Sequence, residues 1–133
     1  MSERKVATAE EFLTSPAMDR QKEDVEVPEL GEGVVIPIWG MTPRERTIWE
    51  DRQTSLPKEK RAVQKHQIRE RLLVECCKDD QGVSIFTRSQ IEQLGQRRSD
   101  VVERLVNVAL RLSGFNNADV EKLAKNSDAS HEE

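Results

Sequence analysis

The chain is short of aromatic residues: it has no tyrosine, and aromatic side chains make up only 4% of its 133 residues. Apolar residues account for 35% and charged residues for another 35%, so we expect one soluble domain with a modest core. No run of about 18 apolar residues exists, and the N-terminal MSERKVATAEEF lacks the apolar stretch of a secretory signal. These absences argue against a membrane-spanning or secreted protein.

Residues that carry chemistry are also scarce. Cys76 and Cys77 are adjacent, which predicts two reduced thiols beside a buried helix face rather than a disulfide framework. His66 and His131 stand in no Cys-x-x-Cys or His-x-x-x-His pattern, which argues against a zinc site. The Gly-Glu-Gly at 31–33 lacks the third glycine and the lysine of a phosphate loop. The sequence therefore predicts no enzyme, no metal and no cofactor.

The net charge of −4 is unevenly distributed along the chain. Residues 1–33 carry 4 basic and 9 acidic side chains, whereas residues 42–71 carry 9 basic and 5 acidic ones. Such alternation argues against general nucleic-acid binding, which needs a basic face with little opposing acid. It is compatible with a head-to-tail homo-oligomer, in which an acidic segment meets the basic segment of the next copy, and also with a solvated surface that has no partner.

The hydrophobic pattern predicts a mostly α fold (α+β), with an N-terminal β-hairpin packed on a compact bundle of four to five helices. Residues 1–24 are polar and predict a flexible arm, in which residues 10–13 form one helical turn. Two alternating runs around a glycine turn predict a hairpin over 25–39, within a single domain that spans 25–125. The polar residues 126–133 predict a disordered tail.

Capping signals place the expected helices. Thr-Pro-x-Glu at 42–45 opens a helix over about 43–53, and a second helix is expected over about 58–77. Thr-x-x-Gln at 87–90 opens a short helix that ends at Gly95, and a strongly apolar helix follows over about 99–113. A last helix turns Val120 and Leu123 inward. The expected core residues are Leu72, Leu105, Ala109 and Leu112.

The segment 87–112 also has the outline of a helix-turn-helix. A recognition helix must present a basic face to the groove, however, and the longer helix here has only Arg104, Asn107 and Arg111 to expose. Packing in the core explains it better, so DNA binding is the second hypothesis.

The join between hairpin and first helix is flanked by Trp39 and Trp49. The two rings either pack together beside the core, or one of them anchors an interface, where Trp is enriched. Because a lone hairpin is marginal in water, its edge is the expected site of strand addition by another copy, and Trp39→Ala is expected to weaken self-association more than it lowers the melting temperature. The self-association candidates are Val34, Ile36, Ile38, Trp39, Trp49, Arg44 and Arg46.

Three segments, in this order, resemble the tail assembly chaperones of long, non-contractile-tailed (siphovirus-type) bacteriophages. They are EVPELGEGVVIPIWGMTPRER, CKDDQGVSIFTRSQIEQLG and VVERLVNVALRLSGF. The first resembles the family's Val-rich hairpin that precedes a capped helix. The second resembles its acidic glycine turn, aliphatic-Phe pair and capped helix, and the third its closing helix.

The resemblance implies a non-enzymatic protein of the infected host cell's cytoplasm that is absent from the mature virion. It would self-associate head to tail or as a spiral, coat the tape-measure protein and recruit tail-tube subunits. The family often makes a longer product by ribosomal frameshifting, and residues 124–126 (Ala-Lys-Asn) are compatible with a slippery A-AAA-AAC. The alternative is a small helix-turn-helix-like DNA-binding regulator of a phage or prophage.

Overall fold

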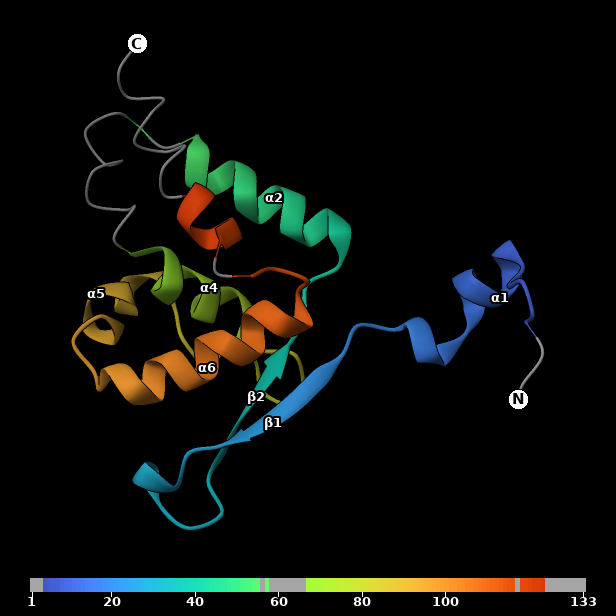
Figure 1. Cartoon of the computed structure of the whole chain (residues 1–133). Helices are drawn as coiled ribbons and strands as arrows, with labels where there is room; N and C mark the ends of the chain where they lie inside the picture. The colour runs from blue at the N-terminus through green and yellow to red at the C-terminus, as the bar shows by residue number, and fades with distance from the viewer. Residues whose placement is uncertain (1–3, 56, 58–66, 117, 124–133) are drawn as a thin grey trace.

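The computed structural model describes residues 4–55, 57, 67–116 and 118–123 (Figure 1). The first half of the helix expected over 58–77, both histidines and the tail 126–133 lie outside these residues. The fold is the expected one, a mostly helical α+β body with a two-stranded antiparallel hairpin. Among the described helices, none is long and apolar enough to span a bilayer.

The hairpin pairs β1 (Lys22–Glu26) with β2 (Val35–Trp39), with Val25 opposite Ile36. A short 3₁₀ turn, η2 (Pro28–Leu30), lies in the connection. The paired residues begin at Lys22, earlier than the expected residue 25 and inside the segment 1–24 that was expected to be a flexible arm. Apolar alternation could not reveal this start, because the added residues are charged and are held by backbone pairing. That pairing continues to Gly40, whose N–H donates to the carbonyl of Gln21 at 2.8 Å.

A segment from the middle of the chain covers the outer edge of β2. Ile38 forms a bridge with Cys77, and the N–H of Lys78 donates to the carbonyl of Pro37 at 3.3 Å. Lys78 in turn bridges to Ser84. The run 83–86, which alternates in the sequence, is therefore a partner of the 77–79 segment rather than a long strand.

Two of the described helices begin where their capping signals predict. Both halves of a capping box are present at Thr42 and Glu45, which open α2 (Pro43–Thr54). A second complete box at Thr87 opens η4 (Arg88–Gln90), which leads into α5 (Ile91–Leu94). The long helices of the core are α4 (Ile68–Cys76) and α6 (Ser99–Leu112), and residues 118–123 are also helical.

The core lies between one face of the hairpin and helices α4 and α6. Leu72, Leu105 and Ala109 are buried in it, whereas Leu112 is only partly buried and packs against its margin. Leu112 occupies the last turn of α6, beside the join at Gly40, so its side chain borders solvent. The buried apolar cluster consists of Val25, Val27, Ile36, Ile38, Trp49, Ile68, Leu72, Leu73, Cys76, Cys77, Leu105, Val106, Ala109, Leu110, Phe115, Val120 and Leu123.

Candidate functional site

The hairpin residues expected at an interface between copies lie mostly inside the protein. Ile38 is 0% exposed and Ile36 is also buried, because both face the helices. Val34 is half-buried at the turn, where its N–H donates to the carbonyl of Gly31 at 3.2 Å. Ile36 and Ile38 therefore stabilise the monomer, and Ile38 has no surface to offer a second copy.

Trp39 attaches the middle segment of the chain to the hairpin. Its indole Nε1 donates to the carbonyl of Lys78 at 3.2 Å, and the Lys22 ammonium lies 5.6 Å from the ring centroid. The side chain is half-buried. Because Trp39 joins parts of one copy, the structure predicts that Trp39→Ala lowers the melting temperature. This prediction replaces the sequence-based expectation that the substitution would mainly weaken self-association.

Trp49 belongs to the core, so it is not an interface anchor. It is 3% exposed and meets the ring of Phe115 edge to face, with centroids 5.7 Å apart and planes at 69°. The two tryptophans thus have different neighbours and do not pack together. The sequence left this open, because Phe115 lies after α6 and no local pattern links it to α2.

The two arginine candidates of α2 have different environments. The guanidinium of Arg46 lies 3.8 Å from the ring centroid of Phe115 and donates to the carbonyl of Gly114 at 3.0 Å. It also forms an ion pair with Glu50 at 3.5 Å. Arg46 therefore holds α2 against the end of α6. Of the two arginine candidates, only Arg44 is exposed.

The free edge of the hairpin is poorly suited to strand addition. β2 is covered by the 77–78 segment, and β1, among the described residues, pairs only with β2. The sequence of β1 is Lys-Glu-Asp-Val-Glu, and the carbonyl of Glu26 already accepts from Arg104 at 3.3 Å. Charged side chains on a short edge strand oppose pairing with another chain. The expected adhesive edge is therefore not supported by the geometry.

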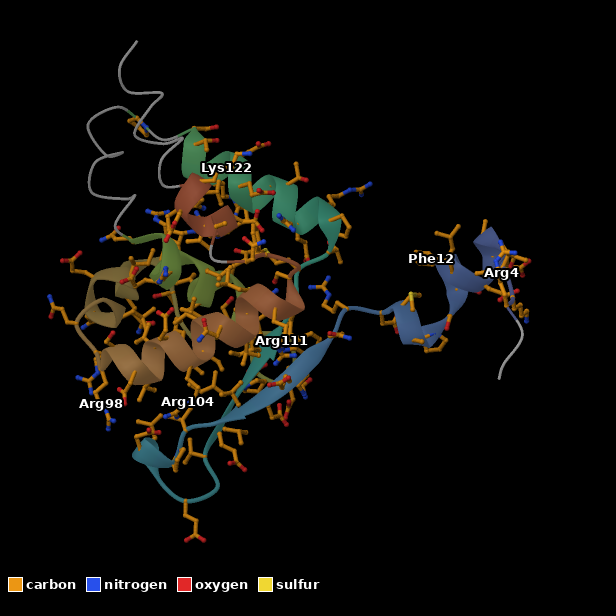
Figure 2. The ribbon with its side chains drawn as sticks, viewed as in Figure 1. Arg4, Phe12, Arg98, Arg104, Arg111 and Lys122 are labelled. Atoms are coloured by element: carbon orange, nitrogen blue, oxygen red, sulfur yellow. The ribbon has the colours of Figure 1, made fainter. Side chains whose placement is uncertain are left out.

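The N-terminal arm carries the largest exposed apolar side chains. Its helix α1 (Ala9–Thr14) is capped by Thr8, and η1 (Pro16–Met18) follows; neither contains a buried residue. Phe12 is 61% exposed and Leu13 is 79% exposed. Figure 1 shows the arm extending away from the body, and Figure 2 shows Phe12 far from the other elements. A six-residue helix has little stability of its own, and α1 leaves both of these apolar side chains exposed to solvent.

An apolar groove of about 320 Å³ lies between the hairpin turn and the start of α6. Its apolar lining residues are Val27, Leu30, Ile36, Phe86, Leu94, Val101, Val102 and Leu105. Glu29, Arg97 and Arg98 complete the lining. We call this set the apolar groove. Its volume is in the range of sites that take a side chain or a small ligand.

The charges at the groove are partly neutralised. Arg104 holds Glu29 with two hydrogen bonds of 2.9 and 2.7 Å, which lower the pKa of that carboxyl to about 2. Arg98 is paired with Asp100 at 2.6 Å. Arg97 is exposed and forms no ion pair within the described ranges. The groove therefore has one guanidinium without a carboxylate.

A second hollow of about 280 Å³ lies beside α2 and α4. Arg52, Arg71 and Arg88 line it together with Trp49. Burial, followed by the nearby charge of Arg88, lowers the pKa of Arg71.

The adjacent thiols are buried, as the sequence predicts. Cys76 and Cys77 are free and 0% exposed. Burial raises the pKa of the Cys76 thiol to about 12 and raises that of Cys77 further. A thiol that stays protonated is a poor nucleophile and a poor metal ligand. Across the described ranges, no group of three or more potential metal-binding side chains occurs.

The basic residues of α6 are engaged by the hairpin. Arg104 pairs with Glu29 at 2.7 Å, and Arg111 pairs with Glu23 at 2.8 Å. A recognition helix would need these guanidinium groups for phosphates and bases, so the geometry does not favour the DNA-binding alternative. Compared with known family models, curated proteins and solved structures, the chain matches none significantly.

Proposed function

We propose that this chain is a non-enzymatic tail assembly chaperone of the siphovirus type. It self-associates, coats the tape-measure protein and recruits tail-tube subunits in the cytoplasm of the infected host cell, and it is absent from the mature virion. Codons 124–126 would allow a longer frameshifted product if they read GCA AAA AAC, and the gene sequence tests that part directly.

The observation that carries this proposal is the exposed apolar arm. Its helix presents Phe12 and Leu13 to solvent in segment 4–21, before β1, whose only ion pair with the body, among the described residues, joins Arg20 to Glu45 at 3.0 Å. A coat along a long polypeptide needs many copies of a small protein that are joined to one another, and an exposed apolar element on each copy can supply the contact between copies. The arm has the chemistry of such an element.

The order of the three family-like segments adds support, because the segments lie together in one body. The first forms β2 and the capped start of α2. The second supplies Cys77 and Lys78, which cover β2, and then the capped η4 and α5. The third is α6, which packs on the hairpin through Arg111 and Glu23. The segments are thus parts of a single structural unit.

Co-expression tests the proposal. The full chain is expressed with and without a siphovirus tape-measure protein, and the soluble fraction of that long protein is measured. We expect the long protein to become soluble and to co-purify with many copies of the chain. If the long protein stays insoluble, the proposed function is contradicted. If the chain also retards labelled DNA in a gel in a salt-dependent way, the DNA-binding regulator is favoured.

A further inference from the structure

We propose that the apolar groove of each copy binds the N-terminal arm of the next copy, and that this exchange is the head-to-tail contact. The proposal deepens the proposed function, because it names the surface through which the chaperone would self-associate. It commits to one occupant, residues 9–14 of a second chain.

The arm and the groove are complementary in chemistry. The arm has the sequence Ala-Glu-Glu-Phe-Leu-Thr, two carboxylates followed by two large apolar side chains. The groove offers an apolar lining with Arg97 and Arg98 beside it. Phe12 and Leu13 would fill the apolar lining while Glu10 or Glu11 meets Arg97, which has no carboxylate partner among the described residues.

The arm and the groove also lie at opposite ends of the hairpin. The arm joins β1 at Lys22, whereas Val27 and Leu30 of the groove follow the other end of that strand. A five-residue strand rises by roughly 15 Å, so the two sites are well separated on one copy. Figure 1 shows the same arrangement, with α1 far from the hairpin turn and the start of α6. Two different surfaces that bind each other form a heterologous contact, which extends into an open, repeating chain when its rotation does not close into a ring.

Two full-length variants separate the two halves of this contact. The arm variant is Phe12→Ser with Leu13→Ser, and the groove variant is Leu30→Glu with Arg97→Glu; all four side chains are exposed in the monomer, so the fold should persist. Val83→Ser is the matched control, because Val83 is 61% exposed and belongs to neither surface. Sedimentation velocity over a concentration series measures assembly, and a thermal melt monitored by circular dichroism checks folding.

We expect the wild-type chain and the Val83→Ser control to form an open series of oligomers. To assemble, each variant alone should need a protein concentration roughly a hundredfold higher than the wild-type chain needs. The arm variant loses the two apolar side chains that the contact would bury, and the groove variant places two carboxylates opposite an acidic arm. An equimolar mixture should form a heterodimer and nothing larger, since only one arm and one groove remain functional in the pair.

Three results would overturn the proposal. The first is assembly of either variant at the wild-type concentration; if such a variant still solubilises the tape-measure protein, the proposed function stands and self-association uses another surface. The second is a mixture that stays monomeric. The third is a wild-type chain that is monomeric and has a protease-resistant arm, together with a groove variant in which the arm is cleaved. That result would mean that each arm occupies the groove of its own chain.

Discussion

Replacing Gly40 with alanine tests how the hairpin, α2 and α6 meet. Gly40 lies at the join, and a Cβ added there would lie 2.4 Å from the carbonyl oxygen of Leu112 and 3.2 Å from its Cβ. The obstacle is backbone at the end of α6, which cannot rotate away. Overpacking of this kind costs about 1–3 kcal/mol. Without the clash, alanine would stabilise the protein by about 0.4–1 kcal/mol, because it reduces the conformational entropy of the unfolded chain. A decrease in the free energy of unfolding therefore indicates the clash, and an increase indicates its absence.

Urea denaturation of Gly40→Ala provides the measurement, and Gly95→Ala is its control. Gly95 has a helical φ of −67°, and the nearest atom to an added Cβ is the carboxylate Oε1 of Glu70 at 3.2 Å. Because that side chain can move, we expect Gly95→Ala to change the free energy of unfolding by less than about 0.5 kcal/mol or to raise it. A Gly40→Ala protein as stable as wild type would show that α6 does not end against the join.

Three further changes have defined outcomes. Arg46→Met should lower the free energy of unfolding by about 1–3 kcal/mol, because it removes a guanidinium stacked on Phe115 and its hydrogen bond to the carbonyl of Gly114. Arg44 is exposed, so Arg44→Met should have almost no effect in the same denaturation assay. The pKa of Glu29 is lowered to about 2 from 4.5, so its ion pair stabilises the fold above about pH 4.5 and is lost as the pH falls toward 2; Glu29→Gln should flatten this part of the pH profile of the melting temperature, and an unchanged profile would contradict the assignment. Cys76 and Cys77 should react with a thiol reagent at pH 8 only after denaturant is added, and rapid labelling of the native protein would contradict their burial.

Local signals in the sequence were enough to predict where α2 and η4 begin. The capping boxes at Thr42 and Thr87 involve residues three apart, so the same short stretch contains both partners. α6 ends at Leu112, two residues before Gly114, whose φ of +78° follows from glycine's tolerance of positive φ. The buried thiols were also predictable, because they follow the apolar face of α4.

Contacts between distant residues could not be predicted in this way. Ile38 is buried because Cys77, far along the chain, covers its edge, and nothing near either residue in the sequence indicates that pairing. Trp49 and Arg46 both depend on Phe115 for their environment. Residues selected as interface candidates for their size and place in the hairpin or α2 were therefore drawn into the monomer by tertiary packing.

The groove was missed for the same reason, since its lining comes from the hairpin turn, Phe86, α5 and α6. The arm left a signal that could have been read: two acidic residues followed by Phe12 and Leu13 in an otherwise polar segment. That signal has meaning only once the arm is known to be separate from the body. A one-dimensional pattern does not distinguish such exposed surfaces from core.

The most direct test of the central claim is the mass of the complex formed with a purified tape-measure polypeptide. The full chain, in excess and at several concentrations, is mixed with that polypeptide, and the complex is sized by sedimentation velocity. We expect one tape-measure polypeptide to carry many copies of the chain, with the number rising with the length of the polypeptide. A chain that stays monomeric at every concentration and forms no complex with the polypeptide would contradict the account.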